Sequence, residues 1–174
     1  MPFILGILGI LAAAYFWAQR ARNAADMAGD LMDMAGDVKA AARRFGFTRK
    51  TNIHPVESIE DPNIAAAGIA EAFLALDDMP TRDQQDKMRV SLRRVLQVDD
   101  AAAEELMVLG HWMVNACGGA QPALSRLSRK LYRLEGPSAL TPLMDIIKGA
   151  LPDDRLSTRQ TEAIAELKTA FRLR

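Results

Sequence analysis

The pattern of apolar and polar residues distinguishes the N-terminal segment from the rest of the chain. Residues 2–18 contain no charged side chain, and Arg20 and Arg22 follow directly. A helix over this run would be about 25 Å long, close to the hydrocarbon thickness of a bilayer. The pattern therefore predicts a single transmembrane anchor over residues 1–19.

Two other interpretations of the apolar run remain open. A cleaved signal peptide has a basic segment before its apolar core and small residues at the cleavage site, whereas here Ala18-Gln19-Arg20 follows the run. A buried core helix also fits the length. Seven Lys or Arg against four Asp lie between Gln19 and Lys50. This positive-inside bias predicts an outside N-terminus and a cytoplasmic domain at a bacterial inner membrane.

Apolar residues then recur at spacings of three and four over residues 20–45, which predicts a helical stalk. Asp26, Asp30, Asp33 and Asp37 form an acidic stripe beside this apolar seam. The seam needs an apolar partner: a second copy, the protein's own domain, or a helix of another membrane protein. Its candidate partner-binding residues are Met27, Leu31, Met34 and Val38.

The pattern changes again beyond the stalk. Residues 46–62 lack periodicity and are predicted to be a linker, and residues 63–174 are predicted to form a compact bundle of about six helices. Capping-box sequences begin at Thr81 and Ser157, and Asp99 precedes a further helix. Because β-branched and aromatic runs are scarce, we predict an all-α fold.

Composition narrows the possible functions. Lys+Arg and Asp+Glu each number 22, so no overall charge attracts nucleic acid. Cys117 is the only cysteine, which excludes an intrachain disulfide and agrees with a reducing cytoplasm. The chain has two histidines and lacks a Ser/His/Asp set, a CxxC, a phosphate loop and an HExxH motif. We therefore predict that it is not an enzyme and has no small-molecule substrate or cofactor.

One predicted helix has a basic face opposite a row of leucines. Three interpretations of this face remain open. It could lie on the anionic inner leaflet, dock an acidic partner, or be the solvated side of a core helix. Its residues are Arg126, Arg129, Lys130 and Arg133.

Acidic residues gather around one predicted turn. Asp77, Asp78 and Asp83 are close in sequence, and Glu135 occupies a comparable turn later in the chain. Ca²⁺ and Mg²⁺ prefer several oxygen ligands, so these four residues are candidate metal ligands. The alternative is that Asp83 favours a helix N-terminus while the other acids are exposed.

The stretch Ile69 to Met107 has an apolar helix, the turn Leu76-Asp77-Asp78, and then an acidic helix that ends before a further cap; Leu134-Glu135-Gly136 marks a second such turn. These features resemble the TerB-like family of small all-α domains, over residues 64–167. The resemblance implies a membrane-associated stress response, including tellurite resistance, with divalent-cation binding by acidic residues. Asp78 replaces the usual Gly, and Glu135 the usual Asp.

An N-terminal membrane helix before such a domain is also similar to the front part of DjlA-type membrane co-chaperones. Those proteins need a J-domain with a His-Pro-Asp motif, whereas this chain has His54-Pro55-Val56 and no J-domain. We therefore expect a non-enzymatic, membrane-anchored adaptor or accessory subunit of an inner-membrane complex. The alternative is a metal-sensing stress-response protein of the tellurite-resistance type.

Overall fold

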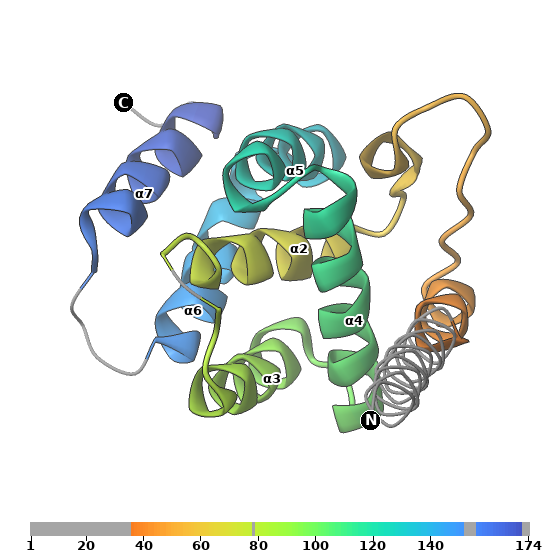
Figure 1. The fold of residues 1–174 in the computed structure, drawn as a ribbon, viewed down its shortest axis with the longest axis horizontal. Coiled ribbons are helices and arrows are strands. Elements are labelled where there is room, and N and C mark those ends of the chain that lie inside the picture. Colours follow the sequence, from red (N-terminus) through yellow and green to blue (C-terminus); the bar gives the residue numbers. More distant parts are fainter. Residues whose placement is uncertain (1–35, 78, 152–155, 172–174) are drawn as a thin grey trace, which may run out of the picture. The chain divides into compact units, whose positions relative to one another are not determined.

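The computed structural model describes residues 36–77, 79–151 and 156–171, and within these ranges its regular secondary structure is helical, without a β-strand (Figure 1). The chain divides into two units, Met1–Asp37 and Val38–Arg174, and the following concerns the second. The predicted all-α class is confirmed. The elements after the helical residues 38–44 are η1 (Pro55–Ser58), α2 (Pro62–Leu74), α3 (Arg82–Leu96), α4 (Asp100–Ala116), α5 (Ala120–Glu135), η2 (Gly136–Ala139), α6 (Leu140–Ala150) and α7 (Thr158–Ala170).

Helix α2 is the central element of the core. All of its residues from Ile64 to Leu74 are buried, because its sequence is apolar on every side rather than on one face. It packs mainly against α4 and α5, while α3 packs mainly against α6 (Figure 1). Helix α7 packs against α5, where Tyr132 and Phe171 make an edge-to-face ring contact.

Small residues allow the closest approach between α2 and α4. A Cβ placed on Gly110 would lie 3.1 Å from the backbone carbon and oxygen of Ala67. It would also lie 3.1 Å from Cγ of Glu71. Because backbone atoms move aside less readily than a flexible side chain, a side chain at position 110 would force the two helices apart by a few tenths of an ångström.

Local capping signals set most of the helix starts. The capping boxes at Thr81 and Ser157 are both present, and the Asp99 side chain accepts from the backbone N–H of Ala102. These predictions are confirmed. Helix α2 begins at Pro62 with Asp61 as its cap, because proline fits the first helical position, where no N–H partner is needed.

The predicted linker, residues 46–62, contributes to the core in its second half. Val56 and Ile59 are fully buried, and the 3₁₀ helix η1 packs against α4 and α5. Phe47 meets Trp112 of α4 edge to face. These residues lie inside the compact unit rather than between two units.

The predicted transmembrane anchor, residues 1–19, lies outside the described residues. Among the helices that the structure does describe, none is both long and apolar enough to cross a bilayer.

Candidate functional site

The basic residues predicted on one helix face lie on α5. Leu124, Leu127 and Leu131 are buried on its opposite side. Arg129 and Arg133 are exposed, while Arg126 and Lys130 are half-buried. The predicted division of this helix into a basic and an apolar face is therefore present in the fold.

Glu57 of η1 holds two of these basic side chains. Arg133 Nη2 donates to Glu57 Oε2 at 2.7 Å, and Lys130 Nζ donates to the backbone carbonyl of Glu57 at 2.9 Å. Both contacts join residues more than 70 positions apart, at separations of 76 and 73. They fasten η1 to α5 and leave Lys130 with less freedom to bind another molecule.

A groove of about 560 Å³ opens beside this contact; we call it the basic groove. Its lining comes from η1, α5 and the end of α7, and consists of Glu57, Arg126, Arg129, Tyr132, Arg133 and Ala170. The described lining residues therefore bring three guanidinium groups and one carboxylate to the groove.

Two of these guanidinium groups have no carboxylate within ion-pair distance among the described residues. Arg129 Nε donates only to the backbone oxygen of Ser125, at 3.1 Å, and Arg126 makes no ion pair there. Among the residues that the structure describes, Arg133 has a carboxylate partner, Glu57. The excess positive charge makes the basic groove suited to carboxylates or other anionic oxygens.

The charges in the basic groove affect one another. Burial alone would raise the pKa of Glu57, but the hydrogen bond and charge of Arg133, with the charges of Lys130 and Arg126, lower that pKa below its ordinary value. Burial and the charge of Arg133 lower the pKa of Lys130, although Glu57 opposes this effect. Both pKa values are lowered, as expected at a site where positive charge outnumbers negative charge.

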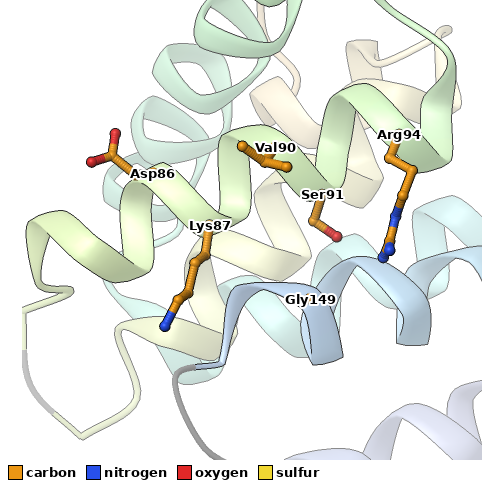
Figure 2. Close-up of a pocket in the computed structure, with 6 residues that line it drawn as sticks. All are labelled: Asp86, Lys87, Val90, Ser91, Arg94 and Gly149. Carbon is orange, nitrogen blue, oxygen red and sulfur yellow. The ribbon is translucent and has the colours of Figure 1, made fainter.

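A second, smaller recess of about 270 Å³ lies between α3 and α6 (Figure 2). Lys87 and Arg94 extend from α3 toward α6, whereas Asp86 points away (Figure 2). Gly149 of α6 faces Ser91, and a Cβ added to Gly149 would come within 3.0 Å of Ser91 Cβ. This recess results from the close packing of α3 on α6, with Ser91 Oγ donating to the carbonyl of Asp145 at 3.3 Å.

The candidate metal ligands do not form a group in the part of the chain that the structure describes. Asp77 and Glu135 are exposed, and Asp83 pairs with Lys87 at 2.8 Å. Asp78 lies outside the described residues. No three Asp, Glu, His or Cys side chains among those described are placed to hold a metal ion.

Acidic side chains at the start of α4 pair with basic residues from two other segments. Arg44 Nη2 lies 2.7 Å from the Asp99 carboxylate and its Nη1 lies 3.5 Å from that of Glu105. Arg89 of α3 pairs with Asp100 and Glu104. These contacts join the start of α4 to residues 38–44 and to α3.

The stalk residues divide between described and undescribed positions. Met27, Leu31 and Met34 lie outside the described residues. Val38 packs against the domain's own core, where Ala41 is fully buried. The end of the apolar seam thus has the protein's own domain as its partner, which is one of the three alternatives that the sequence left open.

Glu71 of α2 is a buried acid that sequence reasoning missed. Only 6% of the residue is exposed, and no described basic residue pairs with it. Burial raises the pKa of Glu71 to about 7. The sequence feature that could have predicted this burial is the position of a single acid in an otherwise apolar helical segment, Ile64 to Leu74.

The other reactive side chains have structural contacts. His54 caps η1 by accepting from the N–H of Val56 and lies 3.2 Å, through Nε2, from the backbone oxygen of Ala116. Burial raises the pKa of Cys117, although the charge of Arg126 opposes it, so the thiol form is favoured.

Comparisons with known proteins give no match to this chain from family models, curated proteins or solved structures. The TerB-like resemblance therefore stays a prediction.

Proposed function

We propose that this protein is a non-enzymatic adaptor, or accessory subunit, of a bacterial inner-membrane complex. The uncharged run over residues 2–18, with Arg20 and Arg22 after it, carries this proposal. In the proposed arrangement this run spans the membrane with the N-terminus outside, and the stalk presents a TerB-like helical domain in the cytoplasm.

The basic groove supports the adaptor role. An isolated solvated helix face would leave its charges spread on a convex surface. Here Arg126, Arg129 and Arg133 instead line a recess, which is the shape that receives a side chain or segment from another molecule. These three guanidinium groups share the single carboxylate of Glu57 among the described lining residues, so the remaining positive charge favours an anionic partner.

Affinity purification of the full-length chain in mild detergent tests this function. We expect a second, different protein in near-stoichiometric amount, because an adaptor acts by holding a partner. Neutralising the groove with R126Q and R129Q should reduce the amount of that protein, whereas R82Q and K148Q on exposed positions elsewhere should not. A preparation that contains this chain alone, in any oligomeric state, contradicts the adaptor role.

A further inference from the structure

Glu57 shows what the basic face of α5 binds within the protein itself. Arg133 Nη2 donates to Glu57 Oε2 at 2.7 Å, and Lys130 Nζ donates to the backbone carbonyl of Glu57 at 2.9 Å. Both acceptors belong to one short segment, η1, which packs on α5. The basic face therefore already holds one peptide segment, through a side-chain carboxylate and a main-chain carbonyl.

This internal contact uses only the C-terminal part of the basic face. Arg126 and Arg129 precede Lys130 and Arg133 on α5, and among the described residues neither of them pairs with a carboxylate. Arg129 is exposed and Arg126 is half-buried, and both line the basic groove. Two unpaired guanidinium groups thus lie next to one that is already paired.

The spacing of the two unpaired groups fits acids on a helix. Arg126 and Arg129 are three residues apart, which is about 4.5 Å along the axis of α5. Acids three or four positions apart on a partner helix have Cβ atoms about 5–6 Å apart. Acids on the same face of a strand are further apart, at about 6.8 Å. Tyr132 and Ala170 add apolar surface to the lining, which suits the apolar stems of helix side chains.

The composition of the groove favours a peptide over a phosphate group or a lipid surface. The lysine of the basic face, Lys130, is directed at the Glu57 carbonyl, and the Glu57 carboxylate lies in the lining. That carboxylate repels a phosphate, with its higher charge, more strongly than it repels a single carboxylate. The recess of about 560 Å³ also has room for several side chains.

We propose, on the basis of the adaptor role above, that the basic groove binds an acidic helix of the partner protein. Two carboxylates of that helix, one turn apart, pair with Arg126 and Arg129. Glu57 limits the contact to these two carboxylates because it occupies Arg133. Glu57 is therefore a specificity-determining residue, which acts by pairing with a guanidinium group that would otherwise accept a third acid.

Peptide selection on the full-length protein in mild detergent tests the proposal. The probe is a display library of helical, alanine-based peptides of about 16 residues, long enough to form a helix, with randomised exposed positions. We expect enrichment of Asp or Glu pairs three or four positions apart. R126E with R129E should weaken binding of a selected, fluorescently labelled peptide by about tenfold or more, since two attractive contacts become repulsive. R82E with K148E changes the charge equally at exposed positions of α3 and α6 and should leave the affinity near that of the wild type.

The role of Glu57 is tested with a selected peptide that carries a third acid one turn beyond the pair. E57Q should strengthen its binding several-fold, because Arg133 is released and a repelling carboxylate is removed. Adding R133Q to E57Q should return the affinity to the wild-type value, since the same two guanidinium groups are then free. If Glu57 only held η1 in place, E57Q would weaken binding or leave it unchanged.

Three results overturn the proposal: a selection without acidic enrichment, a selected peptide indifferent to R126E with R129E, and an E57Q variant that does not bind the three-acid peptide more tightly. Binding to micelles with an anionic phospholipid that depends on Arg126 and Arg129, without selection of acidic peptides, would assign the groove to lipid and also overturns it. The outcome is separable from that of the adaptor role. A co-purifying protein without acidic selection removes this contact alone, whereas acidic selection on a chain that purifies alone removes the adaptor role.

Discussion

Arg133 of α5 and Glu57 of η1 form an ion pair of 2.7 Å that joins two segments 76 residues apart. The pair is half exposed, with 57% of the Arg133 side chain and 34% of the Glu57 side chain accessible. The pair fixes the position of Glu57 and Arg133 in the lining of the basic groove. It also neutralises the guanidinium group of Arg133. The loop before α2 is therefore a part of the candidate site.

Replacing Glu57 with Gln should lower the free energy of unfolding by about 0.5–1 kcal/mol at neutral pH, because partly exposed ion pairs contribute modestly. The folded-state pKa of Glu57 is lowered, so its contribution is present above its ordinary value of 4.5 and is lost as pH falls through the folded pKa. Denaturant unfolding at several pH values measures this. The difference in the free energy of unfolding between the variant and the wild type should vanish in acid.

The matched control for this prediction is Glu60→Gln. Glu60 pairs with Lys50 at 3.1 Å, but its side chain is 75% exposed, so its loss should have a smaller effect. Equal effects of the two substitutions would show that the Arg133 contact adds nothing beyond an ordinary surface pair.

Glu71 should make the protein less stable as pH rises. Its pKa is raised to about 7 by burial, so the folded state keeps a proton that the unfolded chain loses above its ordinary value of 4.5. The contribution of Glu71 to the free energy of unfolding is fully present below pH 4.5 and declines until pH passes about 7, by roughly 3 kcal/mol in total. Urea unfolding across this range measures the decline.

Glu71→Gln should remove most of that decline, because an amide of the same shape does not ionise. Glu162→Gln, at an exposed position of α7, should leave it unchanged. If the Glu71→Gln and wild-type stability curves run parallel between these pH values, Glu71 does not carry the buried proton.

Gly110→Ala should destabilise the fold by about 1–2 kcal/mol. The added methyl group would lie only 3.1 Å from two backbone atoms of Ala67, and the cost of this overpacking exceeds the gain in helix propensity. Thermal unfolding measures the change. Gly36→Ala, where a Cβ meets nothing within 4 Å, should be neutral or slightly stabilising. Equal melting temperatures for the Gly110 variant and wild type would contradict the close crossing.

Local signals in the sequence were sufficient for much of the fold. The caps at Thr81, Asp99 and Ser157 act within three residues of themselves, so their positions follow from the sequence alone. The division of α5 into two faces likewise follows from its periodicity. Helix α2 begins at Pro62, within one residue of the predicted boundary at 63, because Asp61 caps it and Pro62 fits the first helical position.

The candidate site depends on contacts that no local pattern contains. The basic face of α5 was predicted, but the groove needs Glu57 and Ala170, which tertiary packing brings to it from distant parts of the chain. Residues 46–62 are predicted to be a linker because their two buried aliphatic side chains, Val56 and Ile59, are too few to produce a periodic signal. Periodicity shows that a seam needs a partner, but not which one, so the packing of Val38 on its own domain required the structure.

The central claim, a retained membrane anchor, is tested most directly by fractionating cells that express the full-length chain with a C-terminal tag. We predict that the protein sediments with membranes, stays there in alkaline carbonate, and is released by detergent. Removal of residues 1–19 should move it to the supernatant. A full-length protein recovered in the high-speed supernatant, or a mature chain that begins after residue 19, would contradict the account.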